Sequence, residues 1–319
     1  MSVHTIQCEN KVRCVAWSPD GTRFVSGSSN GVIYIWSAMT GEMLRKCGGH
    51  FMGVDSVAWS PDGTQLAAAS FGGWVRVWSA TTGELLYKLH GHTDWSSVAW
   101  SPDDIRFVSG SCDALVCKLR GHTVLGSVAW SPDGTQLAST SNWTVRVWSV
   151  KTNEQLRELR GHTDCVGSVA WSPDGTRIAS RSSDETVCVW SATTGEQLYK
   201  LCGHTGWVCD VAWSPDGTRL ASGSRDCTVC VWSTIRGGLL RELCGHTTCV
   251  TSVAWSPDGT RLASGSDDKT VRVWTLCKWS PLRHCVFMNP KFRQHVFALM
   301  CYCKLDWDCL LELLLLCIN

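Results

Sequence analysis

A histidine, a serine and an aspartate recur together along this chain, and these residue types can form a hydrolytic triad. One copy holds His162, Ser180 and Asp184, and the same spacing returns from His204 and from His246. In a triad the serine would attack, the histidine would take its proton and the aspartate would orient the histidine. An active site is seldom copied around one molecule, however. We therefore expect the trio to be structural and expect no enzymatic activity.

The trio lies within a longer repeated pattern. The hexapeptide Ala-Trp-Ser-Pro-Asp-Gly, or a near copy, occurs seven times, with successive tryptophans separated by 42, 41, 30, 41, 42 and 42 residues. Pro presets φ and Gly tolerates positive φ, so Pro-Asp-Gly indicates a tight turn. Short runs of β-branched and small residues lie between such turns, and each full period holds four strands of about five residues. A fixed period near 41 predicts small sheets that bury their faces by stacking on one another.

These repeats resemble the WD40 family, whose periods begin near Gly-His and end near Trp-Asp. Gly-His occurs six times, from Gly49-His50 to Gly245-His246, and Ser or Thr replaces the Asp after each terminal tryptophan. The resemblance covers about residues 2–274. It implies an all-β fold, a seven-bladed WD40 β-propeller of four-stranded blades around a central channel. It also implies that residues 3–7 supply the outer strand of the last blade, which removes two exposed sheet edges.

The same resemblance assigns the recurring trio, with a tryptophan of the third strand, to a structural hydrogen-bond network. A buried His and Trp need partners for their ring N–H groups, and Asp and Ser provide them. The network is complete in three repeats: His162, Ser180, Asp184 and Trp190; His204, Ser222, Asp226 and Trp232; His246, Ser264, Asp268 and Trp274. It is incomplete in the second repeat, where Ala68 and Gly72 replace Ser and Asp, and in the fourth, where Asn142-Trp143 replaces the acid.

The third repeat and the C-terminal tail depart from the pattern. After residues 109–113 the chain runs directly into Gly121-His122, so the third strand and its tryptophan are missing. We predict a truncated third blade as the weakest point of the ring, where residues 114–120 either cross the blade or leave it open. Residues 1–274 form the propeller. Residues 275–319 are a Cys- and Leu-rich extension outside the family, either helical or disordered, and too short in apolar length to favour a membrane anchor.

Composition limits the possible partners and cofactors. The formal net charge is +1, which gives no reason to expect nucleic acid. Nineteen cysteines, an odd number, and an N-terminus without an apolar run favour free thiols in a reducing compartment. We expect a cytoplasmic protein, with the nucleus as a second possibility, and no metal or other cofactor.

The repeats differ most just after Gly-His and in the second turn, and loops that vary on a fixed framework often carry function. In the family both loops lie on one rim, which implies a partner-binding surface there. We assign to it Phe51, Met52, Phe71, Trp74, Trp95, Trp143, Arg181, Trp207 and Arg225. Trp and Arg are enriched at interaction hot spots. The predicted function is a non-catalytic scaffold for a peptide or protein; a histone-tail reader and a decayed copy without a binding role are the alternatives.

Overall fold

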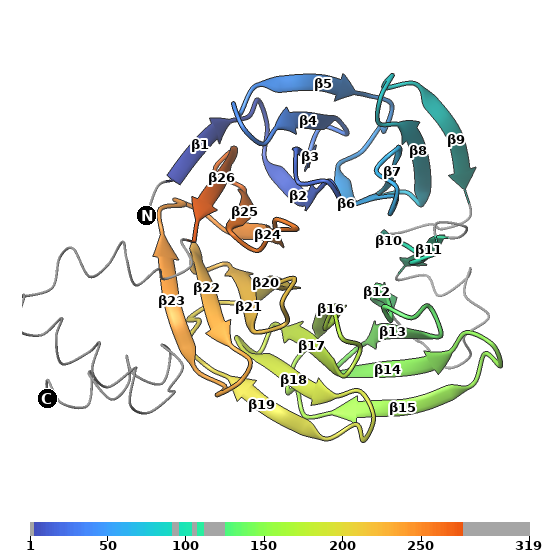
Figure 1. Ribbon diagram of the computed structural model, residues 1–319, viewed down its shortest axis with the longest axis vertical. Helices are drawn as coiled ribbons and strands as arrows, with labels where there is room; N and C mark the ends of the chain where they lie inside the picture. The colour runs from blue at the N-terminus through green and yellow to red at the C-terminus, as the bar shows by residue number, and fades with distance from the viewer. Residues whose placement is uncertain (1–2, 91–95, 104–106, 112–124, 277–319) are drawn as a thin grey trace, which may run out of the picture. The chain divides into compact units, whose positions relative to one another are not determined.

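The computed structural model describes residues 3–90, 96–103, 107–111 and 125–276. It consists there of six four-stranded antiparallel sheets and one two-stranded sheet, arranged as blades around a ring (Figure 1). We number the blades by the order of their hexapeptides. The ring belongs to a compact unit, Met1–Leu276; the second unit, Cys277–Asn319, lies outside the described ranges, as does most of the predicted extension.

Each full blade has four strand positions from the channel outward. The first strands are β2 (Val12–Trp17), β6 (Val54–Trp59), β10 (Ser96–Trp100), β12 (Leu125–Trp130), β16 (Val166–Trp171), β20 (Val208–Trp213) and β24 (Val250–Trp255). The second strands are β3 (Arg23–Ser28), β7 (Gln65–Ser70), β11 (Phe107–Ser111), β13 (Gln136–Ser141), β17 (Arg177–Ser182), β21 (Arg219–Ser224) and β25 (Arg261–Ser266). The third strands are β4 (Ile33–Ser37), β8 (Trp74–Ser79), β14 (Thr144–Ser149), β18 (Val187–Ser191), β22 (Thr228–Ser233) and β26 (Thr270–Thr275). The outer strands are β5 (Met43–Cys47), β9 (Leu85–His90), β15 (Gln155–Arg160), β19 (Gln197–Leu201), β23 (Leu239–Cys244) and β1 (Val3–Gln7).

The outer strand of the last blade comes from the other end of the chain. Strand β1 pairs antiparallel with β26, so that Val3 faces Trp274 and Gln7 faces Thr270. The predicted closure of the ring by the N-terminal segment is therefore confirmed. Closure matters because both β1 and β26 would otherwise expose an unpaired backbone edge.

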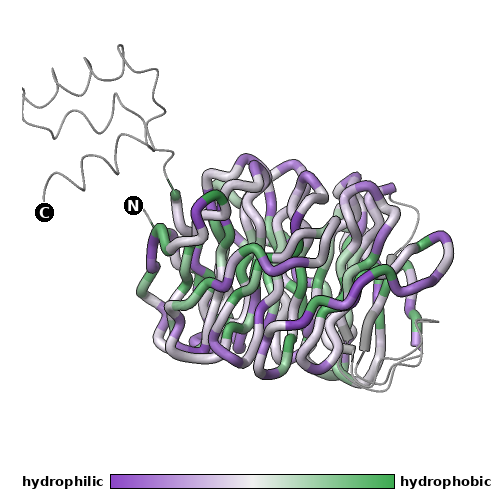
Figure 2. The backbone as a smooth tube through the Cα atoms, turned by 90° about the horizontal axis from the view of Figure 1, so that it is seen from below, coloured by the Kyte–Doolittle hydropathy of each residue, from purple (hydrophilic) through white to green (hydrophobic). Residues whose placement is uncertain are grey.

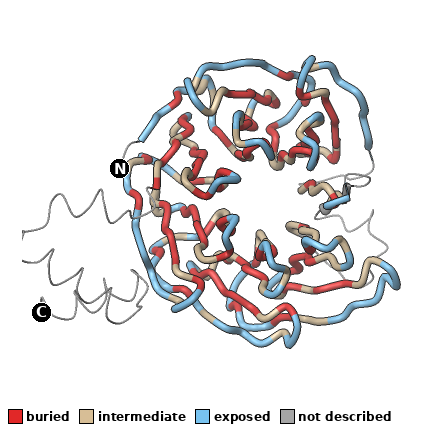
Figure 3. The backbone as a smooth tube through the Cα atoms, viewed as in Figure 1, coloured by how far each residue is buried: buried red, intermediate tan, exposed pale blue. Residues whose placement is uncertain are grey.

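Burial across a blade explains the residue types at each strand position. The second strands are almost entirely buried and consist largely of Ala, Ser and Gly. At Gly223 an added Cβ would lie only 2.7 Å from Val250 of the next blade, so a small residue is required. Outer strands are mostly exposed, as Figure 3 shows, and Figure 2 shows hydrophilic residues gathered at the turns. The core is thus a set of apolar layers between neighbouring blades.

The recurring hexapeptide builds the turn between the first and second strands. In blade 1 the Ser18 hydroxyl donates to Asp20 at 2.5 Å and accepts from the amide of Arg23 at 3.0 Å. The amide of Thr22 donates to the same carboxylate at 3.0 Å. Gly21 has φ of 67°, a conformation that favours glycine. The predicted tight turn is therefore present, and its polar side chains are used within it.

The hexapeptide tryptophans also join the blades. Each indole Nε1–H donates to the backbone carbonyl of the alanine that precedes the tryptophan in the neighbouring blade, at 3.0–3.3 Å. The seven pairs are Trp17 with Ala254, Trp59 with Ala16, Trp100 with Ala58, Trp130 with Ala99, Trp171 with Ala129, Trp213 with Ala170 and Trp255 with Ala212. We call this set the indole belt. It crosses all seven seams of the ring.

The third blade takes part in the belt although only two of its strands are described. Strand β10 packs between β6 and β12. The amide of Val98 donates to the Ser56 hydroxyl at 3.2 Å, and the amide of Val128 donates to the Ser97 hydroxyl at 3.3 Å. The inner layer is therefore continuous through the truncated repeat. The predicted crossing by residues 114–120 lies outside the described residues.

The outer strand of the second blade, which precedes the truncated repeat, has an exposed leucine where other blades bury the corresponding side chain. In the outer strands one apolar side chain near the end is normally buried against the next blade: Leu159 is 1% exposed and shares an apolar cluster with Trp171 and Trp190. Leu89 holds the same position in β9 but is 46% exposed. Its neighbour is the blade whose third-strand tryptophan the sequence lacks. The tryptophan that packs with Leu159 in the next blade, Trp190, thus has no counterpart in the sequence of the third repeat.

Candidate functional site

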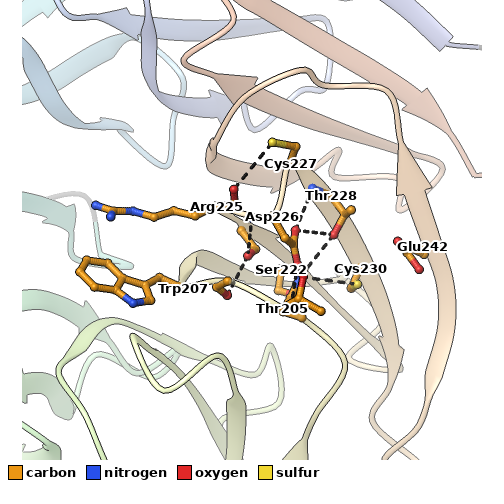
Figure 4. A network of polar contacts seen from close by, with 12 residues as sticks. Thr205, Trp207, Ser222, Arg225, Asp226, Cys227, Thr228, Cys230 and Glu242 are labelled. Atoms are coloured by element: carbon orange, nitrogen blue, oxygen red, sulfur yellow. Dashed lines mark hydrogen bonds and ion pairs between the residues drawn. The ribbon is translucent and has the colours of Figure 1, made fainter.

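Three blades contain the same buried four-residue network. In blade 5, Nδ1 of His162 lies 2.9 Å from Asp184 and Nε2 lies 2.8 Å from the Ser180 hydroxyl. Nε1 of Trp190 donates to that hydroxyl at 2.8 Å. The corresponding distances are 2.7, 2.7 and 2.8 Å around His204 and 2.8, 2.8 and 2.8 Å around His246. Figure 4 shows part of the network in blade 6.

Burial and hydrogen bonding set the protonation states in this network. Burial lowers the pKa of His162 and of His246, so both imidazoles are neutral at neutral pH. Burial alone would raise the pKa of Asp184, but hydrogen bonds from Thr186, Thr163 and the histidine outweigh it and hold the pKa at about 2. A neutral imidazole can then donate from Nδ1 to the carboxylate and accept the serine O–H at Nε2. Every group is used, and each serine is fully buried, so none is presented to a substrate.

In blade 2 an arginine replaces the missing acid. Nη1 of Arg76 donates to Nδ1 of His50 at 2.7 Å. Nε2 of His50 is buried without a hydrogen-bond partner, since Ala68 stands where the other blades have serine. Burial, followed by the charge of Arg76, lowers the pKa of His50 to about 3. Blade 2 therefore holds a neutral histidine with one unsatisfied nitrogen.

Blade 1 has a cysteine at the histidine position, a substitution that sequence reasoning missed. Cys8 stands four residues before Val12, the spacing that separates His204 from Val208. Its thiol bonds to the Ser26 hydroxyl, and burial raises its pKa to about 11. The four-residue spacing between Cys8 and the first strand could have identified this position from the sequence.

In blade 4 the structure describes the serine and the tryptophan of the network. Nε1 of Trp148 donates to Ser139 at 2.8 Å, as in the complete blades. The second turn is reduced to Asn142 and Trp143, with φ of 49° at Asn142, and the histidine of this repeat lies outside the described residues.

Among the described residues, four arginines lie across the seams between blades, and these contacts were not predicted from the sequence. Each lies over the hexapeptide tryptophan of the next blade, with its Cζ 4.6–4.9 Å from the ring centroid: Arg23, Arg177, Arg219 and Arg261. In blade 5, Arg177 also donates to the carbonyls of Thr234 at 3.1 Å and Gly217 at 3.0 Å. Blade 4 has Gln136 at this position, and its buried Oε1 has no partner. The signal was the arginine that follows Gly-Thr in four of the seven hexapeptide copies.

The predicted partner-binding residues divide by exposure. Phe51 is 88% exposed, and Met52, Trp143 and Trp207 are also exposed. Phe71 and Trp74 are half-buried. The loops that carry these residues either lead into a first strand or join a second strand to a third. Because neighbouring strands are antiparallel, both kinds of loop lie on the same rim.

In the described part of this rim, two clusters combine aromatic rings with an arginine. Around blade 2, the buried Arg76 lies with its Cζ 5.8 Å from the Phe51 ring and 5.2 Å from the Trp74 ring. In blade 6, Cζ of Arg225 lies 4.0 Å from the Trp207 ring centroid, and the Arg225 amide donates to the Trp207 carbonyl at 2.9 Å. Figure 4 shows Trp207 and Arg225 projecting side by side, away from the buried network. Both residues of the second cluster are exposed, whereas Arg76 of the first cluster is buried.

Two of the predicted loop residues lie in strands, and a third lies outside the described residues. Arg181 is part of β17 rather than of a loop, and its guanidinium lies over Gly167, where an added Cβ would overlap it. Trp74 is the first residue of β8. Trp95 lies outside the described residues. Arg181 lines the channel cavity rather than a loop, and glycine at position 167 leaves the space for its guanidinium.

A cavity of about 850 Å³ opens along the first strands, and Arg181 and Arg225 both line it. Its charged lining residues are four cations and three carboxylates: Lys11, Arg13, Arg181, Arg225, Asp55, Asp210 and Asp267. The carboxylate of Asp210 accepts from Ser252 and from the amide of Val253, both at 2.9 Å, and burial raises its pKa. Among the described residues no group of three or more His, Cys, Asp or Glu side chains could hold a metal ion.

The family is settled by comparison. The family model described as WD domain, G-beta repeat matches residues 1–37, 41–79, 83–117, 114–149, 153–191, 195–233 and 237–275. The chain therefore belongs to the WD40 repeat family, whose propellers are in general scaffolds for protein interaction. A comparison with curated proteins found no match. Along the described part of the chain, no helix has the length and apolar character to span a membrane.

Proposed function

We propose that this propeller is a non-catalytic scaffold that binds a short peptide, or an extended segment of a protein, on the rim around Trp207. One observation carries the proposal: the Trp207 indole is 46% exposed, and the guanidinium of Arg225, which lines the cavity, is stacked on it. Trp and Arg dominate interaction hot spots because they offer large apolar area together with directed polar contacts. Stacking also fixes the Arg225 side chain before a ligand arrives, which lowers the entropic cost of binding.

The charges around the cavity favour a ligand that carries a carboxylate. Arg225 uses the face of its guanidinium against Trp207, which leaves the N–H edge available for a bidentate contact with a carboxylate. Cations also exceed carboxylates among the lining residues. A basic histone tail would meet these arginines as like charges, so the lining supports an acidic peptide over that alternative.

A displayed peptide library screened against the full-length chain tests the proposal. We expect enriched peptides to combine an acidic residue with an apolar one. Trp207→Ala should weaken binding of a selected peptide at least about tenfold, which corresponds to about 1.4 kcal/mol. Arg225→Gln should weaken acidic peptides selectively.

Met39→Ala supplies the matched control. Met39 is 90% exposed and lies in the turn between a third and an outer strand, hence on the opposite rim. Its replacement should leave both binding and the melting temperature unchanged. Equal losses in the Met39 and Trp207 variants, or a library that yields no enriched peptide, would reject the rim as a binding site and favour a copy without a binding role.

A further inference from the structure

Two cysteines face each other across the seam between blades 6 and 7. Cys209 is the second residue of β20, and Cys249 directly precedes β24. Their sulfur atoms lie 3.5 Å apart, although the residues are 40 positions apart in the sequence. Both side chains are half-buried and line the cavity, so a small molecule can reach them from the channel.

The surroundings of the pair divide it into a nucleophile and a proton donor. The hydrogen bond from Cys249 lowers the pKa of Cys209 to about 7, against the effect of burial, and the charges of Arg181 and Arg225 add to the lowering. The same hydrogen bond, together with burial, raises the pKa of Cys249. At neutral pH a large fraction of Cys209 is thiolate while Cys249 keeps its proton. The thiolate is the reactive form of cysteine.

Among the described residues, the other thiols of the propeller lack this combination. Burial raises the pKa of Cys188 and of Cys230 to about 12, and both are fully buried within their blades. Cys202 and Cys244 are exposed. Nothing in the family resemblance assigns a role to positions 209 and 249.

We propose that Cys209 and Cys249 form a redox site, at which a peroxide oxidises the two thiols to a disulfide that joins blades 6 and 7. This proposal does not depend on peptide binding at the rim. A disulfide needs its sulfurs about 2.05 Å apart, so the two atoms must approach by about 1.5 Å. Side-chain rotation can supply part of this approach.

The reaction balances with one peroxide for each pair. The Cys209 thiolate attacks one peroxide oxygen, the O–O bond breaks, and a sulfenic acid and a hydroxide form; the hydroxide takes a proton and leaves as water. Sulfur of Cys249 then attacks sulfur of Cys209, the S–O bond breaks, and the departing hydroxide takes the Cys249 proton. Two thiols are oxidised, and hydrogen peroxide is reduced to two waters.

Peptide mapping of the full-length chain tests the proposal. The reduced protein is treated with one equivalent of hydrogen peroxide at pH 7, alkylated and digested with trypsin. Trypsin releases residues 201–219 and 242–261, each with a second cysteine, Cys202 or Cys244. The double variant Cys202→Ser/Cys244→Ser therefore leaves 209 and 249 as the only thiols of these two peptides. We expect a linked pair of peptides, about 2 Da lighter than the two reduced peptides together.

Three results would overturn the proposal. The first is the absence of a linked pair of these two peptides in the folded double variant after the peroxide treatment. The second is Cys209 trapped as sulfenic or sulfinic acid without linkage to Cys249. The third is a linked pair that forms no faster in the folded chain than in the chain unfolded in urea. In Cys249→Ser, with circular dichroism unchanged, we expect the sulfenic acid of Cys209 to accumulate because no second thiol replaces its oxygen.

Discussion

The seam between blades 4 and 5 lacks its arginine clamp, and restoring it should stabilise the ring. Gln136→Arg places a guanidinium where Arg177 stands one blade further on. By analogy with that residue, it would lie over Trp171 and donate to the carbonyls of Gly175 and Ala192. The substitution also removes a buried amide oxygen that has no partner.

The size of the gain follows from the contacts of Arg177. A cation over an indole contributes about 0.5–1 kcal/mol, and a hydrogen bond from a charged donor about 1.5–3 kcal/mol. Ordering the long side chain costs up to about 2 kcal/mol. With one such hydrogen bond the balance is about 0–2 kcal/mol, and the second carbonyl contact moves the expectation into the upper half of that range, about 1–2 kcal/mol. With a urea m value near 3 kcal/mol per molar, the unfolding midpoint rises by roughly 0.3–0.7 M.

Urea unfolding followed by tryptophan fluorescence measures this shift, and Arg177→Gln is the reciprocal control. That variant should lose a similar amount, and the double variant should unfold close to the natural protein, because the two seams are separate. If Arg177→Gln leaves the midpoint where it was, the clamps do not hold the seams and the reasoning fails. A lower midpoint for Gln136→Arg would show that the guanidinium does not fit over Trp171.

Three further predictions concern other contacts of the ring. Leu159→Ala should cost about 2–5 kcal/mol in urea unfolding, whereas Leu89→Ala should cost below about 0.5 kcal/mol; equal costs would contradict the account of the truncated blade. Ser222→Ala, which leaves two buried ring nitrogens without their hydroxyl partner, should cost about 2–4 kcal/mol, and a change within error would mean that the network adds nothing. His50 takes up a proton below pH 6.5 in the unfolded chain, but only near pH 3 in the folded chain. Acidification from pH 6.5 therefore favours the unfolded chain, and His50 lowers the free energy of unfolding by about 1.4 kcal/mol per pH unit. His50→Gln should flatten that slope between pH 6 and 4, and an unchanged slope would assign it to other groups.

Much of the fold could be predicted from the sequence because its signals are local. The Ser-Pro-Asp-Gly turn is built from side chains that bond within five residues, as Ser18, Asp20 and Thr22 show. The strand order follows from repetition of one unit, and the place of residues 3–7 follows from a ring that must close. The hydrogen-bond network was predictable for the same reason, since His, Ser and Asp recur at fixed spacing.

What the sequence left hidden depends on contacts between blades. Arg177 reads as an ordinary polar residue at the start of a strand until the next blade brings Trp213 beneath it. Arg181 was placed in a loop, although it lies in β17 and turns into the channel over Gly167. Cys209 and Cys249 belong to different repeats, and their sulfur atoms meet only because β20 and β24 lie in neighbouring blades. A side chain that meets its partner across a seam leaves at most a repeated residue type in the sequence, which does not name that partner.

The indole belt has a consequence for how such a chain can grow. Every hexapeptide carries both halves of the joint: its tryptophan donates to the preceding blade, and its alanine carbonyl accepts from the following one. A duplicated repeat therefore arrives with compatible connectors on both sides, and any copy can succeed any other. The number of repeats is then limited by the curvature of the ring, because the last blade must meet the first. Material can also be trimmed from a blade's periphery, as in the third repeat, while the inner joint to its neighbours is kept.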